Sequence, residues 1–584
     1  MGKLGTSLRP LAAYIKRYRR RIVLGFLCVV TTNAVGMAFP WVLKGAIDDL
    51  TRALTYEKLI RYPLILIGIS LIQAVFRFSM RWILIGVSRD IEYDLRNDFF
   101  SRLLELSPRF YHHNRTGDLM SKATNDIAAV RMLVGPGIMY TANTVLATIL
   151  ALSIMFSIDA RLTLYAMIPL PLVSVAMRFF GSRIHERFEK IQAMFSDISA
   201  RVQENLSGIR VVKSFCQEES EIEAFKQTNR EYIQKNLSLI RLWGTFYPTL
   251  ELLIGLAFVV VLWFGGMQVI AGKISLGSFV AFNTYLGMLV WPMIAFGWVI
   301  NLVERGAASM GRINVILETR PDIADGPEVS VAAGFPIEGE IEFRNLSFAY
   351  NGQPVLQNIN LRIAPGQRVA IVGHTGSGKS TLVHLIPRLY DAPRGTVFID
   401  GRDIRQYPLA ALRSQIGFVP QETFLFSETV AENIAFGVSG AERQSIVRAA
   451  EVSHLFGDVQ RFPKQFDTMV GERGITLSGG QKQRSAISRA VIRNPKILIL
   501  DDALSSVDTE TEEKILRELD AVMRNRTSLV ISHRVSTVKN SDKIIVLSEG
   551  RIVEEGTHNE LLTRDGYYAE LYQKQLLEEE LEQI

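Results

Sequence analysis

Long apolar runs fill the first half of the 584-residue chain and stop near residue 305, where mixed polar and apolar segments begin. A helix of about 20 apolar residues crosses the roughly 30 Å of hydrocarbon in a bilayer. Six runs reach this length, and we predict membrane-spanning helices at residues 22–43, 59–87, 137–158, 162–180, 250–271 and 276–302. Before the first of them, residues 5–20 predict a short amphipathic helix on the inner membrane surface.

Polar segments of unequal length separate these runs. The first and second, third and fourth, and fifth and sixth runs are joined by short links, whereas about 50 and about 70 mostly polar residues occupy the other two gaps. Their helical periodicity favours antiparallel helical pairs over ordinary solvated loops. At 1.5 Å per residue, such pairs extend roughly 35 to 50 Å into the cytoplasm. Breaks in the pattern place their turns near residues 114–118 and 208–213.

The rest of the chain has a different pattern. Proline and glycine residues mark residues 316–338 as a linker, and beyond it short apolar strands alternate with helical segments, which is typical of an α/β domain. We therefore predict three parts. These are an α-helical six-span transmembrane domain with long cytoplasmic helical extensions (1–315), the linker (316–338) and an α/β domain (339–584).

Charged side chains inside the predicted spans are costly in lipid, so Arg77, Arg81 and Glu251 are expected to face a cavity or a partner. Glu251 is a candidate for contact with a cationic substrate or a proton. A structural ion pair, or a position near the membrane interface, fits it equally well. Aromatic and methionine residues of the last run, including Trp291, either line an adaptable apolar pocket or face lipid and pack against helices.

The formal net charge of +6 does not indicate a nucleic-acid partner. Much of the basic excess lies in clusters such as residues 16–21, directly before the first apolar run. The positive-inside rule explains this placement and puts the N-terminus in the cytoplasm. The chain is therefore expected to be a multi-pass membrane protein that binds no nucleic acid.

One stretch of the α/β domain carries a specific chemical signal. It fits the pattern G-x-x-x-x-G-K-[ST], in which backbone N–H groups surround phosphate oxygens, a lysine reaches the β- and γ-phosphates, and a hydroxyl meets Mg²⁺. A short apolar strand precedes it, and a helix whose N-terminus favours anions follows it. This P-loop predicts binding of ATP and Mg²⁺ by Gly373, His374, Thr375, Gly376, Ser377, Gly378, Lys379, Ser380 and Thr381.

Five further residues each stand at or just after the end of a strand-like segment. Tyr350 is an aromatic residue suited to stacking on adenine. Gln421 is a candidate to contact Mg²⁺ and the attacking water, and Asp501 is a candidate Mg²⁺ ligand. Asp502 stands where a carboxylate would orient or deprotonate water, and His533 is a candidate to hydrogen-bond the γ-phosphate.

A second anion-binding helix end is predicted where Ser478, Gly479, Gly480 and Gln481 begin a helix. A single nucleotide does not need two such ends in one small domain. The economical explanation is that two domains meet head to tail, and each supplies this helix end to the ATP of the other.

These motifs resemble those of the ATP-binding cassette (ABC) family. Tyr350 resembles the A-loop aromatic residue, Gly373 to Ser380 the Walker A motif, Gln421 the Q-loop, Leu477 to Gln481 the signature, Asp501 the Walker B aspartate, Asp508 the D-loop and His533 the switch histidine. Residues 468–474 resemble the X-loop of exporters. The resemblance covers the whole chain, because a six-span domain followed by one cassette is similar to a half-transporter of the multidrug-exporter type.

The resemblance implies a transporter ATPase in the bacterial plasma membrane, with its cassette in the cytoplasm. Two such halves form one transporter, in which ATP binding turns the cavity outward and hydrolysis resets it. The turns that carry Asn114, Gly117, Asp118, Gly208 and Arg210 correspond to coupling helices. The implied cargo is amphipathic drugs or lipids. A lipid flippase and an ATP-gated channel or regulatory membrane protein remain as alternatives.

Asp502 departs from the usual pattern, since most active cassettes carry glutamate directly after the Walker B aspartate. Aspartate is shorter by one methylene, which draws the carboxylate back by roughly 1 Å, and misplacement of that size costs about a hundredfold in rate. In the family, aspartate at this position is often seen in one member of a heterodimer. The chain most resembles that subunit in bacterial heterodimeric multidrug exporters, so we favour a second, glutamate-bearing half-transporter as partner over a homodimer.

Overall fold

The computed structural model describes residues 7–52, 55–326, 329, 337–471, 474, 476–507 and 509–582. The chain forms two compact units. The first comprises Met1–Leu104 and Arg115–Thr319, and the second comprises Glu105–Asn114 and Arg320–Ile584. Most of the second half of the predicted linker falls outside the described residues, as does Asp508.

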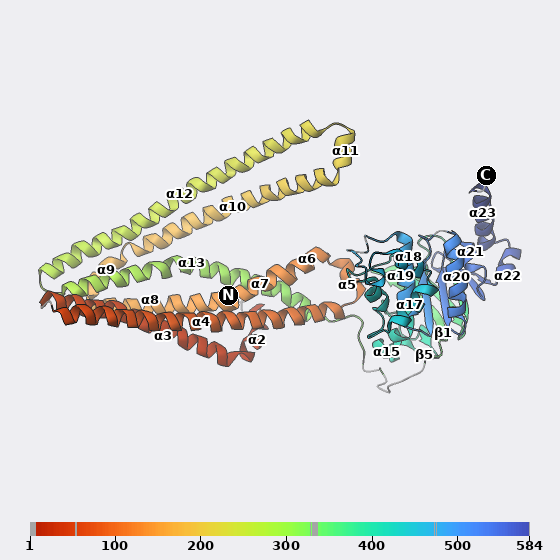
Figure 1. Ribbon diagram of the computed structural model, residues 1–584, viewed down its shortest axis with the longest axis horizontal. Coiled ribbons are helices and arrows are strands. Elements are labelled where there is room, and N and C mark those ends of the chain that lie inside the picture. Colours follow the sequence, from red (N-terminus) through yellow and green to blue (C-terminus); the bar gives the residue numbers. More distant parts are fainter. Residues whose placement is uncertain are drawn as a thin grey trace. The chain divides into compact units, whose positions relative to one another are not determined.

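The described part of the first unit consists of helices and their connections (Figure 1). In chain order these are α2 (Leu11–Arg17), α3 (Arg19–Arg52), α4 (Tyr56–Glu105), α6 (Thr116–Ser121), η1 (Lys122–Asp126), α7 (Ile127–Met132), η2 (Leu133–Gly137), α8 (Ile138–Ile158), α9 (Ala160–Met167), α10 (Leu170–Ser207), α11 (Ile209–Ser214), α12 (Glu218–Ile270) and α13 (Leu276–Glu318). Helices α10 and α12 pack together as a long hairpin that α11 closes (Figure 1). The elements η1 and η2 are π-helical turns between α6 and α8.

Among the described residues, five helical stretches are long and apolar enough to cross a membrane. They are Arg19–Arg52, Tyr56–Glu105, Thr116–Ile158, Glu218–Ile270 and Leu276–Glu318. Each stretch contains one of the predicted runs. The run at residues 250–271 extends one residue beyond its helix, which ends at Ile270. The fourth predicted run, residues 162–180, is instead divided between α9 and α10, with Ile168 and Pro169 at the break. Because proline has no backbone N–H to continue a helix, the run is interrupted, and the count of six spans is not confirmed.

A buried apolar cluster connects helices α3, α8, α9, α12 and α13 of the first unit. Met155 of α8, Leu162 of α9, Val261 of α12 and Phe282 of α13 are all completely buried within it. Tyr285 of α13 is equally buried and donates a hydrogen bond of 2.7 Å to the carbonyl oxygen of Met37 in α3. The cluster therefore connects helices that are far apart in the sequence.

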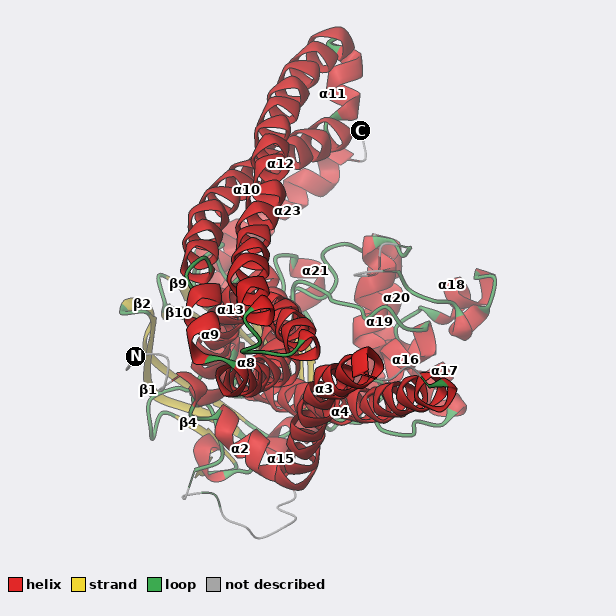
Figure 2. Cartoon of the chain, turned by 90° about the vertical axis from the view of Figure 1, so that its left-hand side faces the viewer, coloured by secondary structure: helices red, strands yellow, loops and turns green. Residues whose placement is uncertain are grey.

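The second unit contains all the strands of the described chain, drawn in yellow in Figure 2. They are β1 (Ile341–Tyr350), β2 (Gln353–Ile363), β3 (Arg368–Val372), β4 (Val397–Ile399), β5 (Arg402–Asp403), β6 (Ile416–Val419), β7 (Ile497–Asp501), β8 (Thr527–Ile531), β9 (Lys543–Ser548) and β10 (Arg551–Gly556). One sheet has four antiparallel strands in the order β2-β1-β4-β5. The other has six in the order β10-β9-β3-β8-β7-β6, and its strands are parallel except β10.

Helices surround these sheets. They are α5 (Pro108–His113), α14 (Lys379–Leu385), η3 (Ile404–Gln406), α15 (Leu409–Ser414), α16 (Val430–Ala435), α17 (Arg443–Val452), α18 (Phe456–Arg461), η4 (Gln465–Asp467), α19 (Gly479–Val491), α20 (Thr509–Met523), α21 (Val535–Val538), α22 (His558–Thr563) and α23 (Tyr567–Glu582). Strands β7 and β8 are buried at every position, as expected for parallel strands that are covered on both faces.

The register of the six-stranded sheet decides where the functional loops lie. Ile371 of β3 pairs with Ile531 of β8, and Ile531 pairs with Asp501 of β7. These three strands therefore end side by side, and the loops that follow them share one edge of the sheet. In open α/β sheets, ligands bind outside the carboxyl ends of the strands.

Candidate nucleotide-binding and hydrolysis site

The predicted phosphate loop connects β3 to α14, and two of its glycines are required by close packing. A Cβ on Gly373, whose φ is +149°, would lie 2.1 Å from the carbonyl oxygen of Leu547. On Gly378, whose φ is +100°, it would lie 2.8 Å from Cδ2 of Leu356. An L side chain rarely adopts these φ values, so glycine allows the loop to turn tightly against the sheet.

Lys379 lies beneath this loop, and its side chain is buried. Its Nζ donates hydrogen bonds to the carbonyl oxygens of Gly373 at 2.9 Å and His374 at 2.8 Å. Burial lowers the pKa of Lys379, although nearby Asp501 and Asp502 oppose the shift. The buried hydroxyl of Ser377 has no hydrogen-bond partner within the described chain. Both groups are donors that suit phosphate oxygens.

Ser380 and Asp501 meet across the base of the loop. The hydroxyl of Ser380 donates to Oδ1 of Asp501 at 3.0 Å, and Asp501 is 1% exposed. Burial raises the pKa of Asp501, while the hydrogen bond from Ser380 opposes the shift. Hydroxyl and carboxylate oxygens are hard donors that fit Mg²⁺. Ser380 and Asp501 would hold Mg²⁺ here, and the ion would supply positive charge that stabilises the phosphates of a bound nucleotide.

The remaining predicted hydrolysis residues lie around the same space. A cavity of about 180 Å³ is lined by Val355, Thr375, Gly376, Gly378, Lys379, Ser380, Thr381, Gln421, Asp501, Asp502, Ile531 and His533. Asp502 has a φ of +48°, and its N–H donates to the carbonyl oxygen of Ile531 at 3.0 Å. The structure therefore brings together side chains that are separated by more than 150 positions in the sequence.

A larger cavity of about 650 Å³ adjoins the phosphate loop at Ser380 and Thr381 and contains Tyr350. The ring of Tyr350 lies 5.1 Å from that of Tyr390, edge to face. Burial raises the pKa of both tyrosines, so both rings stay neutral. A neutral aromatic pair beside the phosphate loop is suited to contact a purine.

Sequence reasoning missed part of this larger cavity. Helix α5 belongs to the same compact unit, and His112 Nε2 lies 3.0 Å from the hydroxyl of Tyr390. Arg109 donates to Oδ1 of Asn351 at 3.2 Å. Neither α5 nor Tyr390 belongs to a recognisable sequence motif, since both reach the cavity only through tertiary packing.

The predicted second anion-binding end begins α19. Ser478 is its N-cap: Ser478 Oγ accepts from the N–H of Gln481 at 3.3 Å, and Gln481 Oε1 accepts from the N–H of Ser478 at 3.0 Å. Gly479 and Gly480 both lie close to Ser506. A Cβ added to Gly479 would lie 3.4 Å from the Cβ of Ser506, and a Cβ added to Gly480 would lie 3.2 Å from the carbonyl oxygen of Ser506. Within the described chain, none of these residues lines the two cavities above.

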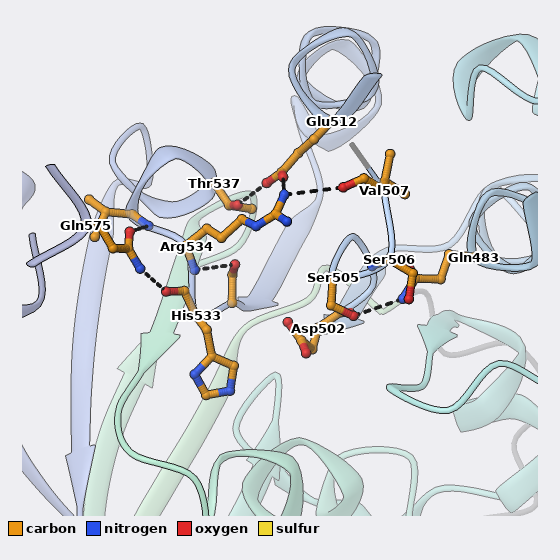
Figure 3. A network of polar contacts seen from close by, with 12 residues as sticks. Gln483, Asp502, Ser505, Ser506, Val507, Glu512, His533, Arg534, Thr537 and Gln575 are labelled. Carbon is orange, nitrogen blue, oxygen red and sulfur yellow. Dashed lines mark hydrogen bonds and ion pairs between the residues drawn. The ribbon is translucent and has the colours of Figure 1, made fainter. Parts of the chain in front are cut away.

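Helix α19, which begins at the predicted signature, is hydrogen-bonded to the loop that follows β7. Gln483 is 3% exposed, and its side-chain amide makes two hydrogen bonds. Its Nε2 donates to Ser505 Oγ at 3.0 Å, and its Oε1 accepts from the N–H of Ser506 at 2.9 Å (Figure 3). Gln483 therefore connects α19 to the loop that follows β7 by two hydrogen bonds.

The residues predicted as coupling elements are divided by the structure. Asn114 is the C-cap of α5 and belongs to the second unit, whereas Gly117 and Asp118 lie on α6 in the first unit. The residues of α5 that contact the cassette precede the predicted stretch. Gly208 is the N-cap of α11, and Arg210 lies within that helix.

The predicted substrate-cavity residues lie on three different helices. Arg77 is on α4, Glu251 on α12 and Trp291 on α13, and all three side chains are exposed in the single chain.

Comparison with known proteins identifies the architecture. A family model described as "ABC transporter transmembrane region" matches residues 22–293, and one described as "ABC transporter" matches residues 356–505. The chain is 39% identical, over 98% of its own length and 98% of the relative, to the probable multidrug resistance ABC transporter ATP-binding/permease protein YheI of Bacillus subtilis. The chain belongs to the ABC transporter family.

Other relatives of this ABC transporter carry different names. The multidrug resistance-like ATP-binding protein MdlA of Escherichia coli is 36% identical over 98% of the chain and 97% of that protein. An ATP-dependent lipid A-core flippase of Syntrophus aciditrophicus is 37% identical over 96% of the chain and 93% of that protein. The solved structure of a bacterial Atm1-family ABC exporter with ATP bound matches with a TM-score of 0.78 and 31% identity, covering 95% of this chain and 98% of that one.

These matches establish what the two units are. The first is the membrane-spanning region of an exporter, and the second is a cytoplasmic cassette that binds nucleotide and hydrolyses ATP. The sequence-based prediction of a helical membrane domain followed by an ABC cassette is therefore confirmed.

Proposed function

We propose that this ABC transporter is one half of an exporter that uses ATP to move amphipathic compounds across the bacterial plasma membrane by alternating access. One observation carries the proposal: Lys379, Asp501 and His533 surround one cavity, whereas in the described chain Ser478 begins a helix that does not line it. A cassette with this arrangement needs a second cassette to complete each ATP site. The full-length similarity to proteins named for multidrug resistance supports the cargo class.

Binding of ATP is assigned to the two adjoining cavities. Tyr350 stacks on adenine, and the N–H groups of the phosphate loop surround the phosphates. Lys379 exchanges the carbonyl oxygens of Gly373 and His374 for phosphate oxygens. The exchange is favourable because a charge-assisted hydrogen bond is stronger than one to a neutral carbonyl.

Hydrolysis is assigned to the strand ends. Ser380, Asp501 and Gln421 hold Mg²⁺, and the donor set of hydroxyl, carboxylate and amide oxygens matches its preference. Asp502 orients the attacking water, and His533 donates a hydrogen bond to the γ-phosphate. Gly479, Gly480 and their neighbours Ser478 and Gln481 contact the ATP that the partner cassette holds.

We infer that the partner is a different half-transporter with glutamate at the position of Asp502. The test is vanadate-sensitive ATP hydrolysis by the chain purified alone in lipid nanodiscs. Wild type is expected to be slow, and Asp502→Glu is expected to raise the rate by about ten- to a hundredfold, since it returns the carboxylate by roughly 1 Å. Asp502→Asn, the matched control without a carboxylate, should be slower than wild type. A fast wild-type rate that Asp502→Glu leaves unchanged would favour a homodimer.

Coupling of the cassette to the membrane helices is assigned to α5 and α11. Helix α5 contacts Tyr390 and Asn351 at the larger cavity, which is assigned to adenine. In the sequence, α5 connects α4 to α6. We expect Arg109→Ala combined with His112→Ala to lower the amount of cargo moved for each ATP hydrolysed. An unchanged ratio of transport to hydrolysis would remove α5 from this role.

Lipid flipping is a second candidate function, favoured by the 37% identity to a protein named as a lipid A-core flippase. The two cargo classes are separated by parallel assays on one preparation. ATP-dependent accumulation of a cationic dye in inverted vesicles supports drug export, and ATP-dependent movement of a fluorescent phospholipid between leaflets supports flipping. Glu251→Gln should weaken dye accumulation if Glu251 contacts cationic cargo.

A further inference from the structure

The C-terminal helix α23 reaches the loop that carries His533. Figure 3 shows the side-chain amide of Gln575 against the backbone on both sides of Arg534. Its Nε2 donates to the carbonyl oxygen of His533, and its Oε1 accepts from the N–H of Val535 at 2.7 Å. One amide thus bridges the residue that carries the imidazole and the first residue of α21.

The hydrogen bond from Val535 to Gln575 pairs an N–H at the start of α21 that no local side chain caps. A helix N-cap is usually Ser, Thr, Asp or Asn, whose side chain accepts from N–H groups of the first turn. The N-cap of α21 is Arg534, which makes no such bond. Gln575 therefore supplies the acceptor from another helix. Val535 is 2% exposed, so leaving its N–H unpaired would be costly.

Helix α23 is itself held firmly at its start. The completely buried Tyr568 packs with Val535 and Val538 of α21 in one apolar cluster, and Leu571 and Tyr572 pack against it. Glu554 accepts from the N–H of Tyr567 at 2.6 Å. Gln575 follows Leu571 by one helical turn, so the anchored face of the helix carries the amide to the loop.

The side chain of Arg534 holds the loop from the opposite side. It forms an ion pair with Glu512, which is 1% exposed, and it donates to the carbonyl oxygen of Val507 at 3.4 Å. Thr537 donates to the other oxygen of Glu512 at 2.5 Å. The segment after His533 is thus held from two sides, by Gln575 of α23 and, through the Arg534 side chain, by Glu512 of α20 and Val507 of the loop that precedes it (Figure 3).

We propose, resting on the proposed role of His533 in hydrolysis, that Gln575 is a positioning residue for ATP hydrolysis. Its amide fixes the backbone that presents His533 to the γ-phosphate, which makes α23 part of the catalytic apparatus. The side chain of His533 is exposed and lines the cavity with Asp501 and Asp502. Its direction therefore depends on its backbone. Without the hydrogen bonds of Gln575, residues 533–535 move more freely, and the imidazole of His533 is displaced from the position in which it reaches the γ-phosphate.

The first experiment measures the bridge without reference to activity. Hydrogen exchange of the full-length chain in nanodiscs is followed in peptides that cover residues 533–538. Gln575→Ala should speed exchange there by about fivefold, the ratio that corresponds to loss of one hydrogen bond. Gln575→Glu keeps the acceptor for Val535 but loses the donor to His533, so its exchange should be intermediate. Gln573→Ala, on the same helix but exposed, is the matched control and should match wild type.

The second experiment measures catalysis with radiolabelled ATP under single-turnover conditions, which resolve slow rates. Gln575→Ala should lower the maximal rate by about tenfold, because misplacing a catalytic group by 1 Å costs up to a hundredfold. The half-saturating ATP concentration should stay within about twofold, because His533 acts on the reacting phosphate rather than on binding. In a His533→Ala background, Gln575→Ala should have no further effect on the rate.

Two results would overturn the proposal. In one, Gln575→Ala behaves like Gln573→Ala in both experiments. In the other, Gln575→Ala slows hydrolysis as much in the His533→Ala background as alone, which would assign its effect to general stability. The thermal unfolding midpoint of each variant is measured in parallel, and Gln575→Glu provides the test if the alanine variant folds poorly.

Discussion

Replacing Lys379 tests whether the buried ammonium group recognises phosphate. In the structure this group is 6% exposed and bonds to two carbonyl oxygens of its own loop, at 2.9 and 2.8 Å. Lys379→Ala removes the charge and the side-chain volume together. Lys379→Met keeps an unbranched stem of similar length and removes only the charge and the donors. Comparison of the two variants separates recognition of phosphate from packing.

The expected size of the effect follows from the bonds that are exchanged. A hydrogen bond to a charged group contributes about 1.5 to 3 kcal/mol, and the bonds to Gly373 and His374 are given up when phosphate is bound. If the net gain equals one charge-assisted bond, the dissociation constant for ATP rises by about 10- to 150-fold in both variants. Lys379→Ala should also unfold at a lower temperature than Lys379→Met, because it leaves a cavity beneath the loop.

The assay is equilibrium binding of a fluorescent ATP analogue to the full-length chain in nanodiscs, with Mg²⁺ present. Lys496→Ala is the matched control, since Lys496 is exposed at the opposite end of β7 and should bind as wild type does. An unchanged dissociation constant in Lys379→Met, in a sample whose unfolding temperature matches wild type, would refute the assignment of this lysine to the phosphates.

Two further predictions concern the same loop. Gly378→Ala should weaken ATP binding, because the added Cβ would lie 2.8 Å from Leu356 and strain the loop by about 1 to 3 kcal/mol. Gly376→Ala should weaken ATP binding less, because its Cβ would meet nothing within 4 Å. Equal binding by the two variants would contradict this prediction. Burial lowers the pKa of Lys379, so its ammonium form is lost at a lower pH than that of a free lysine. In the same binding assay, the ATP affinity of wild type should therefore fall as the pH rises toward the ordinary lysine range, and more steeply than that of Lys379→Met. Parallel curves would contradict this prediction.

The cassette was predictable from the sequence because its motifs combine local pattern with fixed chemistry. The strand-like segment predicted to end at Tyr350 is β1, the short strand predicted before the phosphate loop is β3, and Ser478 is the N-cap of α19 as expected. Apolar runs between glycine-rich loops mark such strands, and parallel pairing then gathers their ends at one edge. That pairing explains why the sequence alone is enough to assign Asp501 and His533 to one site.

Other features could not be predicted because they depend on tertiary contacts. His112 and Tyr390 meet at the larger cavity although no local pattern connects them. The bridge from Gln575 to the His533 loop joins residues 42 positions apart, and a glutamine in a polar helix carries no signal of its own. The divided fourth run shows a related limit: its hydropathy is continuous, whereas Pro169 interrupts the helix there.

ATP-dependent accumulation of a cationic amphipathic dye in inverted membrane vesicles tests export most directly. The vesicles carry the chain with Asp502→Glu, and matched vesicles carry the same chain with Lys379→Ala added. Export predicts that the dye accumulates against its gradient only with ATP and Mg²⁺, and that the added Lys379→Ala abolishes accumulation. Robust ATP hydrolysis with dye that only equilibrates across the membrane would contradict export and would indicate an ATP-gated channel.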